Sequence, residues 1–148
     1  MSDWEFEIRP RLTPYFAYAA AALIVTAHVT VGLLLKVGST GVIFRTADQV
    51  AIALLGCVIG AVVLLFARPR VRVGAAGVAV RNLWSDKVIP WPHVVGVTFP
   101  RGARWARLEL PDDEYVPVMA IQSVDREHAV AGMEQLRAAI VRHRSHTQ

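Results

Sequence analysis

The sequence predicts an α+β membrane protein, in which a two-helix transmembrane hairpin precedes a small antiparallel β domain closed by a C-terminal amphipathic helix. Residues 15–35 and 50–67 contain no Asp, Glu, Lys or Arg, and a helix of either length crosses roughly 30 Å of hydrocarbon. From residue 70 onward, short segments alternate apolar and polar side chains before the pattern becomes helical. The predicted parts are an N-terminal cytoplasmic strand or tether at 1–14, the hairpin at 15–67 and a cytoplasmic domain at 68–148.

The hairpin is predicted to place both termini in the cytoplasm. The run at 15–35 is interpreted as an anchor and not as a cleaved signal peptide, because acidic residues precede it and it is longer than a usual signal segment. Lysine and arginine near the membrane ends set the orientation, and five of them flank the termini against two in the connecting loop. The five are Arg9, Arg11, Arg68, Arg70 and Arg72, and the two are Lys36 and Arg45.

Three residues inside the hairpin are candidates for helix packing. Gly56 and Gly60 have the spacing that lets two helix backbones approach closely. They pack either against the alanines at 19–22 and Ala27 of the same hairpin or against a second copy or a partner helix. His28 lies in the middle of the first span, where an ionisable residue is a candidate proton relay or ligand. A neutral imidazole bonded to a threonine or a backbone carbonyl explains it equally.

The N-terminal segment Trp4–Ile8 alternates large apolar and acidic side chains, which is the pattern of a half-buried strand. One interpretation is a tether whose Trp4 and Phe6 rest among lipid headgroups. The other is a strand that folds back onto the C-terminal domain. The sequence leaves both open.

The C-terminal part is predicted to form an antiparallel meander, either a barrel or a pair of packed sheets. The clearest strand is 104–110, in which Ala106, Leu108 and Leu110 share one face. The other expected strands are 70–73, 78–83, 87–90, 94–99 and 114–120.

A helix is expected to follow the last strand. Ser123 or Asp125 can cap it. Its predicted buried stripe is Val130, Met133, Leu136 and Ile140.

The chemistry of the chain predicts no catalytic residue, metal or cofactor. The single cysteine, Cys57, excludes an internal disulfide and a cysteine-based zinc site. The acidic run at 112–114 is typical of a solvated turn. His143 and His146 lie in a basic stretch of sequence, which is more typical of a protein surface than of a metal site. The net charge is +4, and residues 68–148 carry 12 basic against 8 acidic side chains. Next to a bilayer, this excess favours anionic lipid over nucleic acid as a partner.

Several stretches together carry a family resemblance. They are Trp4–Arg11, Arg68–Arg72, Gly77–Val78 leading to Asn82–Leu83, Ile89–Val97 and Val118–Gln122. The chain resembles the actinobacterial two-span membrane proteins with a bacterial pleckstrin-homology (PH) domain of the low-molecular-weight-antigen type. The resemblance implies a PH-like fold in the bacterial cytoplasmic (inner) membrane. It also implies an interaction module, since PH-like domains bind phosphoinositides, peptides or partner proteins.

The candidate binding surface follows from that resemblance and from where the sequence departs from it. Lipid-binding PH domains cradle the headgroup with basic residues on the first two strands and on their long loop, whereas the turn Gly74–Gly77 is short and uncharged. The sequence therefore predicts a diffuse basic face in place of a headgroup cradle. Trp105 is either exposed among the arginines of this face or buried against the N-terminal strand. The candidate lipid- or partner-binding residues are Arg68, Arg70, Arg72, Arg81, Arg101, Arg104, Trp105 and Arg107.

The expected function is therefore a non-enzymatic, membrane-anchored PH-like module that holds a protein or an anionic lipid at the cytoplasmic face. An alternative is an accessory subunit of a larger membrane complex, which associates through Gly56, Gly60 and His28. A third hypothesis is proton handling through His28, which requires oligomerisation because two spans do not enclose a pathway.

Overall fold

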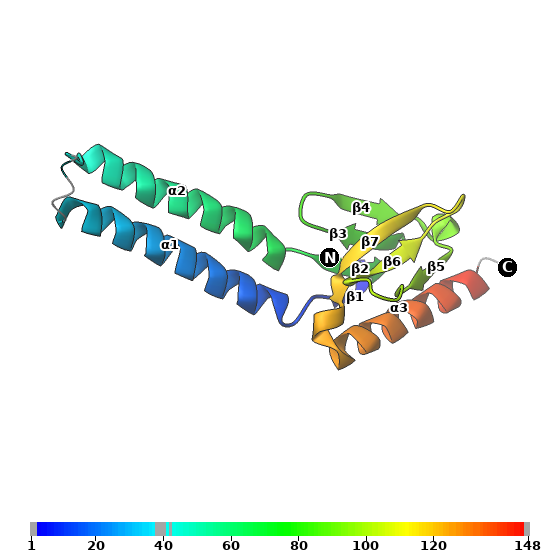
Figure 1. Cartoon of the computed structure of the whole chain (residues 1–148). Helices are drawn as coiled ribbons and strands as arrows, with labels where there is room; N and C mark the ends of the chain where they lie inside the picture. Colours follow the sequence, from blue (N-terminus) through cyan, green and yellow to red (C-terminus); the bar gives the residue numbers. More distant parts are fainter. Residues whose placement is uncertain (1–2, 38–40, 42, 147–148) are drawn as a thin grey trace. The chain divides into compact units, whose positions relative to one another are not determined.

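The computed structural model describes residues 3–37, 41 and 43–146 of the 148-residue chain. These residues form two compact units (Figure 1). The helical unit is Thr13–Ala67, and the sheet unit combines the residues up to Leu12 with those from Arg68 onward. The helical unit is thus inserted into the sequence of the sheet unit.

Two long helices make up the helical unit. Helix α1 spans Thr13–Val37 and α2 spans Thr46–Leu64, followed by the 3-10 turn η1 at Leu65–Ala67. Both helices are long and apolar enough to cross a membrane by length and composition. At the loop end both helices continue past the predicted spans, to Val37 and back to Thr46, because a helix does not have to end where the uncharged run ends. At the other end α2 stops at Leu64, and η1 occupies the last three residues of the predicted span.

Glycines lie where α1 and α2 meet. Gly56 is buried, and a Cβ added to it would lie 2.5 Å from the Cβ of His28. Gly60 is also buried, and a Cβ there would lie 3.1 Å from Val25 Cγ2 and 3.8 Å from Ala21 Cβ. Both glycines therefore give the two helices of one hairpin room to approach each other.

Two polar side chains within the helical unit bond to backbone carbonyls. The Gln49 amide on α2 donates to Gly32 O on α1 at 2.8 Å. Nδ1 of His28 lies 2.8 Å from Ile24 O, one turn earlier in α1. The contact with a backbone carbonyl that the second interpretation named is present, and the proton-relay hypothesis stays a prediction.

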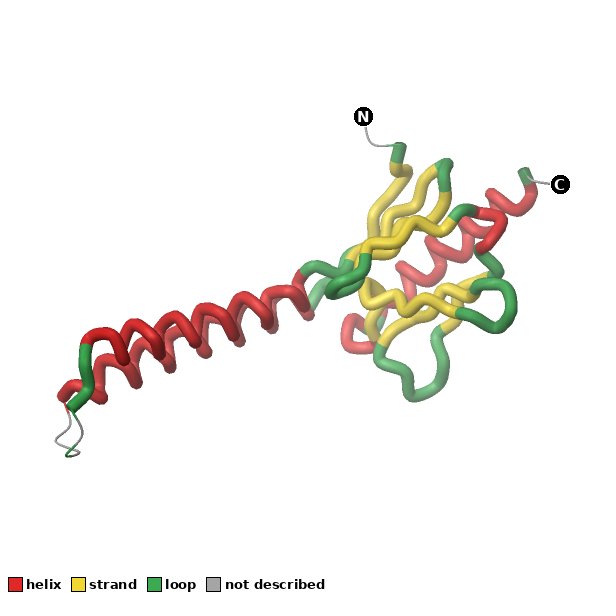
Figure 2. Tube along the Cα trace, turned by 90° about the horizontal axis from the view of Figure 1, so that it is seen from above, coloured by secondary structure: helices red, strands yellow, loops and turns green. Residues whose placement is uncertain are grey.

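The sheet unit contains two antiparallel sheets. The first has the order β1-β2-β3-β4 and the second the order β5-β6-β7. The strands of the first sheet are β1 Trp4–Ile8, β2 Arg70–Gly74, β3 Gly77–Arg81 and β4 Asp86–Ile89. Those of the second are β5 Gly96–Thr98, β6 Trp105–Glu109 and β7 Tyr115–Gln122. The sheets are not closed into a barrel (Figure 2). The barrel prediction is therefore wrong, and the alternative of two packed sheets is the arrangement observed.

The N-terminal segment is a strand of the first sheet. Strand β1 pairs antiparallel with β2, with Ile8 opposite Val71 and Phe6 opposite Val73. Ile8 is 5% exposed and belongs to the core, which the apolar side chains of both sheets fill. The whole helical unit therefore separates β1 in sequence from β2, the strand with which it pairs.

Helix α3, Glu127–Ser145, closes the core along one side of the sheets (Figures 1 and 2). Its buried stripe includes Met133, Leu136 and Ile140, as the sequence predicts, together with Ala129. Val130, however, is 58% exposed. The predicted stripe is wrong at this position because the helix turns Ala129 toward the core and Val130 away from it.

Candidate functional site: the arginine-rich end of the sheet unit

One end of the sheet unit carries both connections to the helical unit. Strand β1 ends at Ile8 and α1 begins at Thr13, whereas η1 ends at Ala67 and β2 begins at Arg70. Because Ile8 pairs with Val71 at the start of β2, the two linkers leave the first sheet at the same end. This end is called the linker end below.

A buried carboxylate fixes the first linker. Oδ2 of Asp125 accepts the backbone N–H of Arg11 at 2.9 Å, and Oδ1 accepts that of Leu12 at 2.9 Å. Asp125 is only 7% exposed. Next to it, Nε2 of His128 lies 2.8 Å from Arg9 O. The segment that precedes α3 therefore holds the chain where it enters α1.

This contact corrects the predicted role of Asp125 as the cap of the last helix. The residue before α3 is Arg126, which has a positive φ of 47° and makes no side-chain cap hydrogen bond. The sequence shows only that Asp125 stands near a helix start. That its carboxylate reaches a segment more than a hundred positions earlier depends on the tertiary fold.

Three of the predicted arginines lie on neighbouring strands of the first sheet. Arg70 on β2 is directly opposite Arg81 on β3. The Arg81 guanidinium donates two hydrogen bonds to Asp86 Oδ2, at 2.9 and 2.7 Å. The Arg72 guanidinium lies 4.8 Å from the centre of the Trp4 ring, a cation–π contact. Arg68 is exposed in the second linker.

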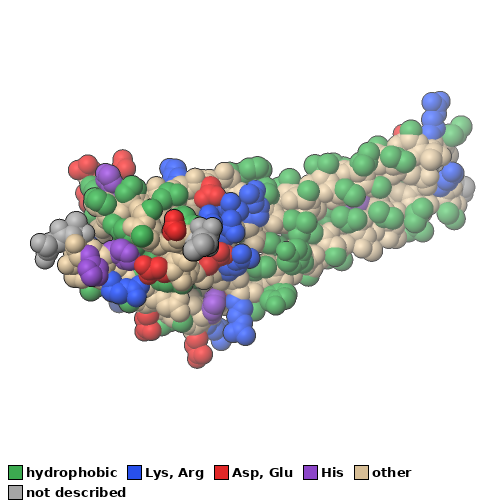
Figure 3. Space-filling model, turned by 180° about the vertical axis from the view of Figure 1, so that it is seen from behind, with side chains coloured by type: hydrophobic (Ala, Val, Ile, Leu, Met, Phe, Trp, Pro, Cys, Tyr) green, Lys and Arg blue, Asp and Glu red, His purple; other side chains and the backbone are tan. Residues whose placement is uncertain are grey.

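The charges in this cluster are unbalanced. Nε of Arg70 is buried without a hydrogen-bond partner among the described residues. Burial, followed by the positive charges of Arg81 and Arg72, lowers the pKa of Arg70. The hydrogen bond from Arg81 holds the pKa of Asp86 below its usual range. An approaching anion would therefore be attracted to this part of the sheet. Lys and Arg side chains also gather at one end of the sheet unit in Figure 3.

The remaining predicted residues belong to the second sheet, and only some reach the linker end. Arg101 and Arg104 are exposed in the turn between β5 and β6. The Ser123 N–H donates to Arg104 O at 2.9 Å, which places this turn beside the segment containing Asp125. Trp105 is half-buried on β6, opposite Gln122.

Arg107 lies farther along β6, with its guanidinium 4.3 Å from the centre of the Tyr115 ring. The strand β1, against which Trp105 was expected to be buried under one interpretation, pairs in the other sheet. Arg107 therefore contacts its own sheet and is not part of the cluster formed by Arg70, Arg72 and Arg81.

Trp84 is a candidate residue that the sequence analysis missed. It lies in the turn between β3 and β4 and is 81% exposed. Turn centres usually carry Gly, Asn, Asp or Ser. Two large apolar residues at this position, Leu83 and Trp84, are therefore unusual, and this is the signal in the sequence that could have identified the turn as a candidate. Because the residue falls between two alternating segments, periodicity gave it no role.

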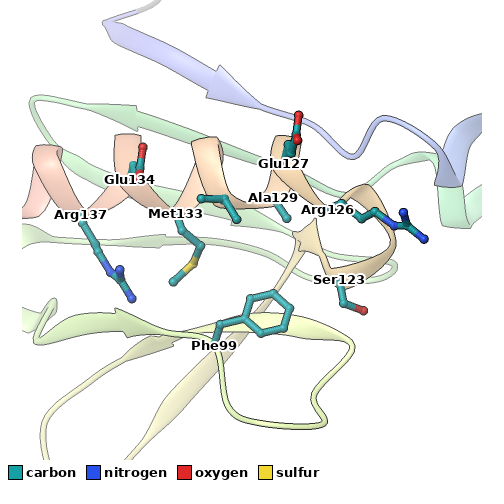
Figure 4. Close-up of a pocket in the computed structure, with 9 residues that line it drawn as sticks. Phe99, Ser123, Arg126, Glu127, Ala129, Met133, Glu134 and Arg137 are labelled. Carbon is teal, nitrogen blue, oxygen red and sulfur yellow. The ribbon is translucent and has the colours of Figure 1, made fainter.

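A separate apolar cavity of about 590 Å³ lies between α3 and the start of the β5–β6 turn. Figure 4 shows Met133 and Arg137 pointing from α3 toward Phe99, with Glu127 and Glu134 on the other side of the helix. Within the described ranges, no group of three or more His, Cys, Asp or Glu side chains is placed to hold a metal. The cavity could therefore hold a ligand through its shape and through apolar contacts with residues such as Phe99 and Met133.

The fold defines the class of this protein. Residues 68–139 match the bacterial PH domain family. Two antiparallel sheets of four and three strands with one C-terminal helix agree with that match. PH-like domains are typically non-catalytic interaction modules. The match begins at residue 68, whereas the structure shows that β1 completes the first sheet from the other side of the helical unit.

The chain belongs to the bacterial PH-domain family, and it has similar proteins in mycobacteria. An uncharacterised protein of Mycobacterium tuberculosis (strain ATCC 25618 / H37Rv) is 60% identical over 143 residues, which cover 97% of this chain and 93% of that protein. An uncharacterised protein of Mycobacterium bovis shows the same identity and coverage. The matched residues thus span the helical unit as well as the sheet unit. No solved structure shows a significant match.

Proposed function

We propose that this protein is a non-enzymatic, membrane-anchored interaction module, whose PH-like sheet unit holds an anionic lipid or protein partner at the cytoplasmic face of the bacterial cytoplasmic membrane. The observation that supports it most is the insertion of the helical unit between β1 and β2. Both linkers consequently leave the sheet unit at the end where its arginines gather.

The surface of the helical unit supports the anchor. Large apolar side chains point outward along both helices, with Leu23 71%, Leu33 62% and Val58 61% exposed. A surface of this kind is unfavourable in water and suits hydrocarbon, while the helices satisfy their own backbone hydrogen bonds. With the helices across the bilayer, the arginines of the linker end favour the cytoplasmic side.

The binding surface proposed here is the linker end of the sheet unit. Each Lys or Arg near an anionic membrane surface contributes about 1 kcal/mol of attraction. The proposed contacts are Arg68, Arg70, Arg72, Arg81, Arg101 and Arg104, with the half-buried Trp105 beside them. Arg107 stacks on Tyr115 farther along β6 and is left out of the proposed surface. The proposal assigns no catalytic residue, metal or cofactor.

The experiment compares the full chain with a variant carrying Arg70→Glu and Arg81→Glu, each extracted from cell membranes in styrene–maleic acid particles. Mass spectrometry of the particles measures bound anionic lipid and co-purified protein. The proposal predicts enrichment of one of them with the native chain and its loss in the variant. Arg137→Glu, an exposed change on α3, serves as the matched control. Equal recovery from native and variant chains would contradict the proposed surface.

The second candidate is an accessory subunit that associates through the helical unit. Gly56 faces His28, and Gly60 faces Ala21 and Val25, so both glycines already have contacts inside the hairpin. This candidate therefore depends on the outward apolar side chains. A stoichiometric membrane partner that survives the double arginine reversal would favour it.

A further inference from the structure

The turn between β3 and β4 presents a large apolar side chain to its surroundings. The backbone N–H of Asn82 donates to Ser85 O at 2.9 Å, which closes the turn around Leu83 and Trp84. Trp84 is 81% exposed, and Leu83 is half-buried. An indole in this position contacts few atoms of its own sheet. Its exposure is consistent with contact to another surface.

This turn lies at the linker end. Arg81, the last residue of β3, pairs with Arg70, the first residue of β2, and the turn continues beyond that pair. The linkers that leave here contain four and two residues, and such chains reach at most about 14 Å and about 7 Å. Whatever surrounds the ends of α1 and α2 is therefore close to this end of the sheet unit.

The opposite end of the same sheet provides a comparison. The turn between β2 and β3 contains Ala75 and Ala76, which are exposed but small and uncharged. The turn between β3 and β4 carries an exposed indole and follows Arg81, which is paired with Asp86 and lies opposite Arg70 on β2. An apolar ring with a polar N–H, next to arginines, suits the boundary between lipid headgroups and acyl chains.

We infer that the β3–β4 turn is a membrane-interface contact, in which the Trp84 indole enters the headgroup region of the bilayer that holds α1 and α2. The inference rests on the proposed function for the anchor and adds a contact that neither linker supplies. Together with the two linkers, this third point of attachment fixes which side of the sheet unit faces the lipid and which side faces the cytoplasm.

The surface that Trp84 contacts is inferred to be lipid because the chain connects this end of the sheet directly to the two apolar helices. The short linkers bring this end of the sheet to the ends of two apolar helices, so a bilayer around those helices is the nearest apolar phase. The neighbouring arginines match the anionic phosphates of such a surface. A protein partner at Trp84 is the competing outcome that the following test separates.

The test uses intrinsic fluorescence of the full chain reconstituted into phosphatidylcholine–phosphatidylglycerol vesicles, with and without lipids brominated near the headgroup. All four tryptophans lie outside the helical unit, so their emission reports on the sheet unit. Bromine quenches an indole only in direct contact. The inference predicts that Trp84→Phe loses most of the bromine-quenchable emission. The matched Trp91→Phe variant retains it, because the Trp91 indole donates to Gly74 O at the opposite end of the first sheet.

Two outcomes overturn the inference, and a second probe tells them apart. A dye on the native Cys57, exposed on α2, reports whether the helices lie in lipid. If that dye is quenched by bromine near the acyl-chain ends while the emission removed by Trp84→Phe is not bromine-quenchable, the anchor stands and the Trp84 contact is wrong. A Trp84 that binds a protein partner gives the same result, because without that partner its indole stays in water and bromine does not quench it. If the Cys57 dye is also in water, the proposed function fails together with the inference.

Discussion

Asp125 is the residue on which the junction between the first linker and α3 depends most. Its two carboxylate oxygens accept the N–H groups of Arg11 and Leu12, each at 2.9 Å. Hydrogen bonds to a charged group contribute about 1.5–3 kcal/mol. We therefore expect Asp125→Ala to lower the free energy of unfolding of the sheet unit by about that amount.

Urea unfolding of the full chain in nanodiscs, followed by tryptophan fluorescence, measures this change. Asp113→Asn is the control, because Asp113 is exposed in a turn with a φ of 58°, which asparagine tolerates. Equal stability of Asp125→Ala and the control would contradict the proposed role of the carboxylate.

The ion pair between Asp86 and Arg81 is expected to make the free energy of unfolding depend weakly on pH in the acidic range. The hydrogen bond from Arg81 holds the pKa of Asp86 below its ordinary value of 3.8. The folded state therefore binds the proton more weakly than the unfolded state. The stabilisation is complete above pH 3.8 and is lost as the pH falls through the folded-state pKa. Since the Asp86 side chain is 45% exposed, the effect stays below about 1 kcal/mol.

The Asp86→Asn variant tests this prediction. Native and variant chains are unfolded at a series of pH values between neutral and strongly acidic. We expect the native chain to be the more stable at neutral pH and the difference to shrink below pH 3.8. A difference that stays constant through this range would exclude the ion pair as its cause.

Single residues also show where sequence reasoning stops. The inward residues Ala106 and Leu108 follow from alternation and are fully buried. Trp84 lies in a turn, where no period applies, and its exposure becomes visible only when the neighbouring strands are in place. Val130 and Ala129 are adjacent on one helix, and only the direction from which the sheets pack decides which one is buried.

At the scale of elements, β1 is predicted to be as necessary to the core as the strands after the helical unit. Ile8 is 5% exposed, and its Cγ2 would lie 3.2 Å from a Cβ placed on Gly132 of α3. Truncation of a buried isoleucine costs about 2–5 kcal/mol. We therefore expect Ile8→Ala to destabilise the sheet unit by this amount in the urea experiment.

Val88→Ala is the matched change, since Val88 is 54% exposed on β4 of the same sheet. Its expected cost is within about 1 kcal/mol. If the two variants were equally stable, β1 would be a tether and not part of the core.

The contact between α1 and α2 gives a second prediction for elements. A Cβ on Gly56 would lie 2.5 Å from His28 Cβ, closer than two carbons tolerate. Gly56→Ala must therefore move the helices apart, and overpacking of this kind costs about 1–3 kcal/mol. Val58→Leu, which adds volume at a 61% exposed position, should leave the contact unchanged.

Energy transfer between dyes on cysteines introduced at Tyr15 and Phe66, in a Cys57→Ala background, reports the separation of the helices during an SDS titration. Both positions are exposed. Gly56→Ala is expected to lose transfer at a lower SDS fraction than the native chain. Identical titrations would show that the glycine is not needed for the contact.

Element types follow from the sequence more readily than their pairing. Each predicted strand from residue 70 onward appears in the structure with shifted ends, because alternation is a local property. The partner of Trp4–Ile8 is not local, since the helical unit separates it from β2. Choosing between a barrel and two sheets likewise requires knowing which edges pair, and alternation does not contain that information.

At the scale of the whole molecule, the insertion of the helical unit into the sheet unit has a functional consequence. Two covalent connections at one end of a sheet restrict its rotation more than one connection does. Under the proposed function, both connections start from the end of the sheet that carries Arg70, Arg81 and Trp84. The acidic turn at 112–114, which joins β6 to β7, lies at the end opposite the β5–β6 turn with Arg101 and Arg104.

Cysteine accessibility in spheroplasts tests the central claim most directly. In a Cys57→Ala background, single cysteines replace Ile43, which precedes α2 and is 90% exposed, or Ala75, in the exposed β2–β3 turn. The account predicts that a membrane-impermeant maleimide labels the Ile43→Cys chain in intact spheroplasts and the Ala75→Cys chain only after permeabilisation. Labelling of Ala75→Cys in intact spheroplasts, or recovery of the chain in the soluble fraction after lysis, would contradict it.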